Sequence, residues 1–176
     1  MLISFLRQLM NAGGDTTFRG TSVLLTGLLS HPEQWEAVAA DRSLIPQAID
    51  EALRWEGPVA ATDRYVAHDT VLDGVPLQKG TILNVVLGSA NRDPAKFTDP
   101  DKFDIFRDRK VRHLAFANGP HVCIGQHLAR VEMTRALNAL LDRTRNMRLD
   151  PDRPAPDIRG HSLRVPDHIY VKFDKA

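Results

Sequence analysis

The chain has 176 residues, enough for one domain with a sizeable hydrophobic core, and its 23 basic and 22 acidic residues nearly cancel. This balance predicts no nucleic-acid partner and no binding to a charged membrane surface. The single cysteine excludes a disulfide scaffold and indicates a reducing compartment, which we expect to be the cytoplasm. No apolar run is long enough for a membrane anchor, and residues 1–10 lack the basic region and cleavage site of a signal peptide.

Two apolar stretches at the start of the chain have helical spacing, and residues 12–17 lie between them. Gly13 and Gly14 each cost a helix about 1 kcal/mol relative to alanine. One interpretation is therefore a break between two helices. The other is one long helix that is opened at its middle, where the glycines let a flat cofactor approach and Asp15 and Thr16 supply an acid and an alcohol.

Helices are predicted over residues 32–40 and 44–55, followed by short strands at 64–66, 71–72 and 81–87. Turns are expected at Asp73-Gly74 and Lys79-Gly80. The second helix contains Glu51 and Arg54 at i,i+3 spacing, which by itself indicates a surface ion pair worth a few tenths of a kcal/mol. Residues 99–112 are polar and irregular, and residues 169–173 alternate like a strand that closes a hairpin.

The only cysteine, Cys123, lies in a segment with Gly119 and Gly125 on either side of it. These glycines predict a tight loop, and the helical pattern that follows Gly125 places the thiol just before a helix. A lone cysteine is either a small buried hydrophobic residue or a reactive or ligating thiol. The positive end of the helix dipole favours a thiolate, which is a good soft metal ligand.

The segment 116–125 resembles the cysteine loop of the haem-thiolate monooxygenases, the cytochrome P-450 family, whose pattern is Phe-Gly-x-Gly-x-His-x-Cys-x-Gly. The matching residues are Phe116, Gly119, His121, Cys123 and Gly125. Ala117 stands where the first glycine is usual, although alanine tolerates positive φ poorly. Residues 12–17 are similar to the family's oxygen-side helix motif, and Glu51 with Arg54 to its buried structural ion pair.

The resemblance implies a mainly α fold with small β-sheets, corresponding to the C-terminal portion of the haem-thiolate monooxygenase fold. The elements expected in order are a long central helix, the Glu-x-x-Arg helix, a meander, the cysteine loop, a following helix and a terminal β-hairpin. The family's buried pair gains a third charge from an arginine, but Lys102 stands at that position here. Because lysine lacks the planar fork of arginine, we expect a triad that is weaker or differently wired.

The resemblance also assigns site residues. Cys123 would be the axial thiolate ligand of the iron of haem b, and Asp15 and Thr16 would be catalytic, delivering protons during oxygen activation. Further cofactor-binding residues would be Arg64 and His121 on the haem propionates, with Phe116, Ala117, Gly125 and Ala12 around the ring. Glu51 and Arg54 would lock the cysteine loop behind the haem.

The implied reaction inserts one atom of O2 into a small organic substrate, with electrons from a ferredoxin or another redox partner. Basic residues bracket the cysteine loop and would form a docking face for an acidic donor: Arg107, Arg109, Lys110, Arg112, Arg130 and Arg135. Two other interpretations remain open. One is a haem-binding fragment without turnover, and the other is a non-enzymatic helical interaction domain with Cys123 in its core and the glycines in turns.

Family members are more than twice as long as this chain, which begins inside the motif helix. We therefore expect residues 1–176 to form a single partial haem-binding domain, truncated at its N-terminus. The segments that supply most of a substrate pocket would be absent, so the sequence does not define the substrate. The apolar residues at the start of the helix would then be partly exposed: Leu2, Ile3, Phe5, Leu6 and Leu9.

Overall fold

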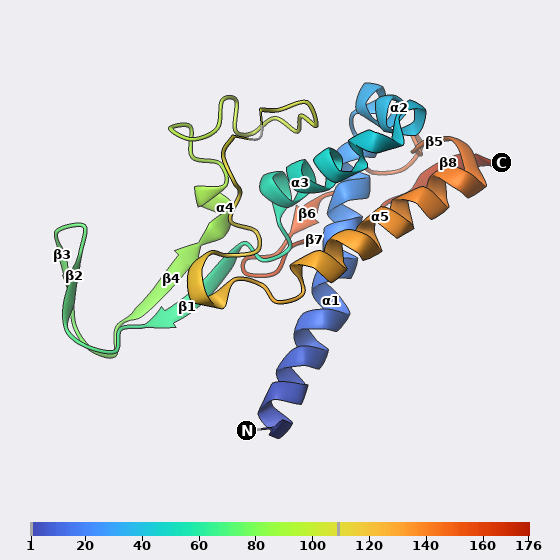
Figure 1. The fold of residues 1–176 in the computed structure, drawn as a ribbon. Helices are drawn as coiled ribbons and strands as arrows, with labels where there is room; N and C mark the ends of the chain where they lie inside the picture. Colours follow the sequence, from blue (N-terminus) through green and yellow to red (C-terminus); the bar gives the residue numbers. More distant parts are fainter. Residues whose placement is uncertain (1, 109) are drawn as a thin grey trace.

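The computed structural model describes residues 2–108 and 110–176 (Figure 1). Its helices are α1 (Leu2–Leu29), α2 (Pro32–Ala40), α3 (Ile45–Glu56), α4 (Leu87–Ala90) and α5 (Gln126–Arg143), with 3-10 turns η1 (Arg42–Leu44) and η2 (Gly119–His121). Its strands are β1 (Ala61–Tyr65), β2 (Thr70–Leu72), β3 (Val75–Leu77), β4 (Ile82–Val86), β5 (Thr144–Leu149), β6 (Ile158–Arg159), β7 (Val165–Pro166) and β8 (Val171–Lys175). Figure 1 shows α1 as a long rod, and the hairpin β2–β3 extends beyond the pair β1–β4. The mainly α fold with small sheets is confirmed.

Helix α1 runs without interruption through residues 12–17, so the interpretation as one long helix is confirmed and the predicted break is wrong. Burial of its second half explains why the glycines do not end it, because tertiary packing outweighs intrinsic propensity. Gly20 marks the point where α1 meets two other helices. A Cβ atom there would lie 3.5 Å from the sulfur of Met133 on α5 and 3.6 Å from the side chain of Leu53 on α3.

The core lies around this crossing and is made by the second half of α1, the inner faces of α2, α3 and α5, and two side chains of the irregular segment 91–118. Its fully buried members include Leu24, Leu28, Val38, Ile45, Ile49, Ile105, Met133 and Leu137. The Gln34 amide on α2 joins the irregular segment to the helices. It donates to the Phe103 carbonyl (3.0 Å) and accepts from the Ile105 N–H (2.9 Å).

The first half of α1 lies outside this core. Its apolar side chains are exposed as predicted, with Leu2 70% and Phe5 56% accessible. Ile3, Leu6 and Leu9 are also exposed. Among the described residues, no helix combines the length and the apolar character needed to cross a membrane.

The strands form antiparallel pairs, β1–β4, β2–β3, β5–β8 and β6–β7. The three strands predicted before residue 90 are present with shifted ends, and the structure adds β3. Positive φ angles at Asp73 (47°), Gly74 (80°) and Gly80 (88°) agree with the predicted turns.

At the C-terminus, a short hairpin joins β6 to β7, but the terminal strand β8 pairs with β5. The sequence analysis did not predict β5, because this strand follows α5 directly with no glycine or proline between them. Its inner side chain, Met147, is buried in the core.

Candidate functional site

The cysteine loop presents its thiol to the outside. Cys123 is exposed, so the interpretation as a buried hydrophobic residue is wrong. The Cys123 N–H donates to the Phe116 carbonyl at 2.9 Å, and the Val122 N–H donates to the Gly119 carbonyl at 3.1 Å. These backbone bonds close a compact loop, and the exposed Cys123 lies where it closes.

Ala117 and Gly119 give this loop its shape. Both have left-handed backbone, with φ of 59° and 77°. Glycine adopts this conformation freely, whereas alanine is strained in it by about 1 kcal/mol or more. The loop therefore keeps its turn despite the alanine, and the strain must be offset by contacts around it.

Helix α5 starts immediately after the loop, with Gly125 as its N-cap residue. A Cβ atom at Gly125 would approach only one atom, the sulfur of Cys123 at 3.9 Å. The thiol thus lies beside the N-terminal end of α5, next to a glycine with open space around it. At its other end, the loop lies against the end of α3, since a Cβ on Gly57 would be 3.4 Å from that of Ala115.

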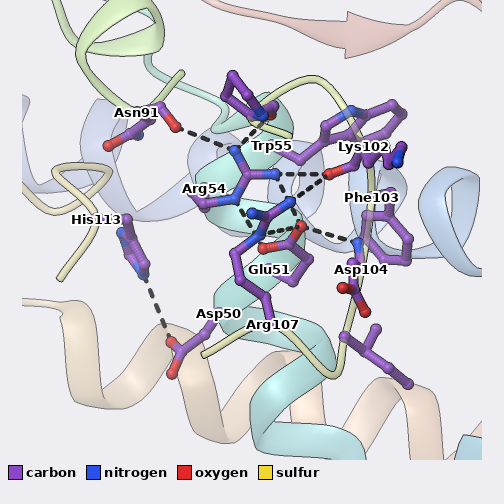
Figure 2. A network of polar contacts seen from close by, with 12 residues as sticks. Asp50, Glu51, Arg54, Trp55, Asn91, Lys102, Phe103, Asp104, Arg107 and His113 are labelled. Atoms are coloured by element: carbon purple, nitrogen blue, oxygen red, sulfur yellow. Dashed lines mark hydrogen bonds and ion pairs between the residues drawn. The ribbon is translucent and has the colours of Figure 1, made fainter. Parts of the chain in front are cut away.

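Behind the loop, Glu51 and Arg54 form a buried ion pair, as the resemblance implied. Their side chains are 5% and 3% exposed, and two parallel bonds of 2.8 Å join the guanidinium to the carboxylate. Arg54 also donates to backbone carbonyls of the irregular segment, namely those of Asn91 (3.1 Å), Pro100 (2.8 Å) and Lys102 (2.9 Å) (Figure 2). The ion pair therefore ties the irregular segment 91–118, which has no strand pairing of its own among its described residues, to helix α3.

The third charge of this cluster comes from Arg107. Its Nε lies 3.3 Å from Oε1 of Glu51 (Figure 2). Its terminal nitrogens donate to the carbonyls of Thr98, Asp99 and Lys102. Lys102 contributes only its carbonyl, because its ammonium group is exposed and pairs with Asp99 at 2.7 Å. The expectation of a differently wired triad is thus met. Sequence reasoning had placed Arg107 among the docking cations, and its position five residues after Lys102 was the only available signal.

A cavity of about 460 Å³ lies between the loop, α3 and α5. Its lining includes Glu51, Arg107, Phe116, Val122 and Arg130. The charged groups among them already pair within the chain. The cavity therefore belongs to the polar support of the loop and does not by itself indicate a ligand.

The α1 motif has open space beside it. The Thr16 hydroxyl donates to the Ala12 carbonyl at 2.6 Å, whereas the Asp15 carboxylate turns to Arg19 at 2.5 Å. Cβ atoms on Gly13 or Gly14 would meet no atom within 4 Å. The structure thus places the Thr16 hydroxyl against the Ala12 carbonyl and the Asp15 carboxylate against Arg19. These residues lie about one helical turn before Gly20, where α1 meets α3 and α5.

Arg64 and His121 are exposed, on β1 and η2 respectively. Arg64 donates to the Thr62 hydroxyl (3.2 Å) and the Asp63 carbonyl (2.8 Å). Both acceptors are neutral oxygens, so the guanidinium charge is available to a carboxylate ligand. In the described parts of the chain, neither Arg64 nor His121 hydrogen-bonds to another predicted cofactor residue.

The expected docking face is less basic than the sequence suggested. Arg107 and Arg130 pair inward with Glu51 and Asp50, and Lys110 pairs with Asp108 at 2.8 Å. Arg109 lies outside the described residues. Arg112 and Arg135 are exposed.

Comparison with known proteins agrees with this geometry. The family model described as Cytochrome P450 matches residues 2–173, so the chain belongs to the cytochrome P450 family. Pulcherriminic acid synthase of Bacillus subtilis is 36% identical, over 99% of this chain and 45% of that protein. Cytochrome P450 monooxygenase PikC of Streptomyces venezuelae is 42% identical, over 90% of this chain and 40% of that protein.

Among solved structures, cytochrome P450 CYP109Q5 from Chondromyces apiculatus superposes with a TM-score of 0.89 at 34% identity. The match covers 97% of this chain and 44% of that one. The chain thus spans less than half the length of these relatives and corresponds to their C-terminal part. The interpretation as an unrelated helical interaction domain is wrong.

Membership of this family implies haem iron ligated by a cysteine thiolate, and Cys123 is the only cysteine. The residues present fit such a group. The thiol is exposed, Gly13 and Gly14 leave room for a flat ring against α1, and Arg64 offers an unneutralised cation.

Proposed function

We propose that this chain is the haem-binding part of a cytochrome P450 monooxygenase, with Cys123 as the axial ligand of haem b. The observation that carries the proposal is the exposed thiol of the only cysteine, held in a strained loop that a buried ion cluster supports from behind. When bound through a thiolate, haem activates O2 so that one oxygen atom enters an organic substrate and the other is reduced to water.

The chain's own residues would bind and orient this group. Arg64 and His121 would hold its carboxylates, because a charge-assisted hydrogen bond is stronger than a neutral one. Ala12, Phe116, Ala117 and Gly125 would lie around the ring. Residues 1–176 would thus act as one partial haem-binding domain.

Asp15 and Thr16 would be the catalytic residues that move protons on the oxygen side. The Thr16 hydroxyl, which donates to the Ala12 carbonyl, can turn to an incoming group without a large change in the helix. The Asp15 carboxylate would first have to leave Arg19. Proton delivery at a positioned side chain is a common contribution to catalysis.

A ferredoxin or another acidic redox protein would supply electrons on the cysteine-loop face. Arg112, Arg135 and Lys110 are exposed cations among the described residues that bracket the loop, and electrostatic attraction would orient the donor. The substrate would be a small organic molecule, and the single cysteine favours the cytoplasm.

The proposed ligation is tested by adding haem to the chain and recording the absorption spectrum of the reduced carbonyl form. We expect the strongly red-shifted Soret band of thiolate ligation in the wild type and its loss in Cys123→Ala. Because the exposed thiol is replaced by a smaller apolar group, the variant should remain folded. A red-shifted band that survives the substitution would contradict the assignment of Cys123.

Proton delivery is tested by Thr16→Ala, measured as product formed per electron consumed. Haem binding should be unchanged, and more of the electrons should end in peroxide. Arg7→Ala, on the exposed first half of α1, is the matched control. Equal coupling in Thr16→Ala and the control would argue against a role for Thr16.

A second function is favoured by one observation: the apolar side chains on the first half of α1 are exposed, so this chain would give little cover to a haem bound beside them. In this case the chain would bind haem but would not convert a substrate. A thiolate spectrum without any product when an electron donor is supplied would favour this function over the monooxygenase.

A further inference from the structure

Asp50 stands one residue before Glu51 on α3 and faces a different part of the molecule. Glu51 faces the irregular segment, whereas Asp50 faces His113 and α5 (Figure 2). Its side chain is 27% exposed, and its Oδ1 atom pairs with the guanidinium of Arg130 on α5 and lies 3.5 Å from Nε2 of His113. One carboxylate thus joins α3, α5 and the residues that enter the cysteine loop.

His113 is oriented for this contact. Its Nδ1 accepts the Ala115 N–H at 3.2 Å, so the ring hydrogen lies on Nε2, toward Asp50. The next residue, Leu114, donates its N–H to the side-chain oxygen of the buried Asn91 at 2.7 Å. The start of the loop is therefore held on two sides.

Arg130 and His113 also contact Phe116. The guanidinium carbon of Arg130 lies 5.1 Å from the centre of the Phe116 ring, within the range of a cation–π interaction. The ring of His113 lies 6.0 Å from that of Phe116. Because the Phe116 carbonyl accepts the N–H of Cys123, a shift of Phe116 reaches the cysteine directly.

The charge of Asp50 suits this arrangement. Burial raises the pKa of its carboxyl, but hydrogen bonds from His113 and Arg130 outweigh burial and hold the pKa below its ordinary value. Asp50 is therefore ionised at neutral pH. Its contribution to stability is present above the unfolded pKa and is lost as the pH falls through the lowered folded pKa.

We propose that Asp50 is a positioning residue for the haem ligand, acting through Arg130 and His113 on Phe116, and through the Phe116 carbonyl on the backbone of Cys123. Only the expected effect of Asp50 on the spectrum of the haem-loaded protein rests on the proposed function. The order of the loop itself can be measured in the chain without cofactor, since Cys123 is the only cysteine and its amide has a defined acceptor.

The experiment compares Asp50→Asn with wild type by amide hydrogen exchange. Removing the charge weakens the bonds to Arg130 and His113, so we expect exchange of the Cys123 amide to accelerate by roughly tenfold. Exchange of the Leu24 and Leu28 amides, in the core half of α1, should change much less. Alkylation of the Cys123 thiol should accelerate in parallel, and Asp50→Glu should restore part of the order because it keeps the carboxylate.

Asp142→Asn is the matched control. Asp142 pairs with Arg42 at 2.9 Å near the other end of α5, so this variant loses an aspartate–arginine pair away from the loop. It should leave the Cys123 amide and thiol unchanged. In haem-loaded protein, Asp50→Asn should raise the fraction of the reduced carbonyl form that has an unshifted Soret band, whereas the control should not.

An unchanged Cys123 amide in Asp50→Asn would overturn the proposal, and so would an equal acceleration at Leu24 and Leu28, which would mean only a less stable fold. A wild-type chain that binds no haem would contradict the proposed function instead, and the exchange experiment would still decide the role of Asp50. The two inferences therefore fail separately.

Discussion

The two sides of the cysteine loop are built in different ways. Behind the loop, Arg54 and Arg107 both bond to Glu51 and to carbonyls of the irregular segment, and Asp50 joins α3 to α5. The groups proposed to lie in front of it, Thr16 and Arg64, share no hydrogen bond or ion pair within the described residues, and their own bonds go to oxygens within four residues of themselves. The chain thus supports its thiol from behind by its own contacts, whereas the proposed front groups would come together only around a shared cofactor.

The largest effect should follow from breaking the support behind the loop with Glu51→Gln. Arg54 and Arg107 would keep their charges but lose the buried carboxylate between them, which costs about 3–5 kcal/mol for a buried pair. Chemical unfolding measures this loss. The exposed Glu36→Gln on α2 is the control and should change stability by less than about 0.5 kcal/mol.

A loss below about 1 kcal/mol in Glu51→Gln would be the value of an exposed pair, and would contradict the burial of Glu51 and Arg54. It would also remove the difference between the two sides of the loop, because neither would then depend on a desolvated charge.

The next effect compares one substitution at two positions of α1. A Cβ on Gly27 would lie 2.5 Å from the ring of Phe103, so Gly27→Ala should destabilise the protein by about 1–3 kcal/mol through overpacking. A Cβ on Gly13 would meet nothing within 4 Å, so Gly13→Ala should stabilise the helix by about 0.5–1 kcal/mol. Thermal or chemical unfolding of both variants measures the two signs.

If the haem ring lies against α1 beside Gly13, the variant with the higher stability should have the lower haem affinity. Gly13→Ala should weaken haem binding despite its gain in stability, because the methyl group enters the space left for the ring. If both variants changed the free energy of unfolding in the same direction, the two halves of α1 would not differ in packing.

The smallest change in stability is expected for a substitution within the cysteine loop itself. Ala117→Gly replaces an alanine at φ 59° by the residue that suits this conformation, and should stabilise the protein by about 1 kcal/mol. Ala115→Gly, at a neighbouring position without positive φ, should instead lower stability by about 0.4–1 kcal/mol through the entropy of the unfolded chain. Matching losses in the two variants would mean that Ala117 is not strained.

The local patterns were predicted correctly because their chemistry lies within a few residues. The glycine turns of the cysteine loop, the pairing of Glu51 with Arg54 and the apolar period of α1 all belong to this kind. The i,i+3 spacing by itself indicated a surface pair, however, and that prediction is wrong because both side chains are buried. Arg107 was misassigned because its carboxylate partner is 56 residues away in the sequence. Strand β5 was missed because it continues from α5 without a turn signal and its partner is the C-terminal strand.

By itself, the sequence predicted the family and the helices in their order, since both depend on residue types at fixed spacing. The roles assigned to Thr16, Asp15, Arg64 and His121 remain predictions of that resemblance. Only the tertiary structure decided that Arg107 replaces Lys102 in the buried cluster and that Asp50 links α3 to Phe116 through Arg130 and His113. Charge pairing and burial depend on which distant segments meet, and the identity of a lysine, an arginine or a leucine does not specify its neighbour in space.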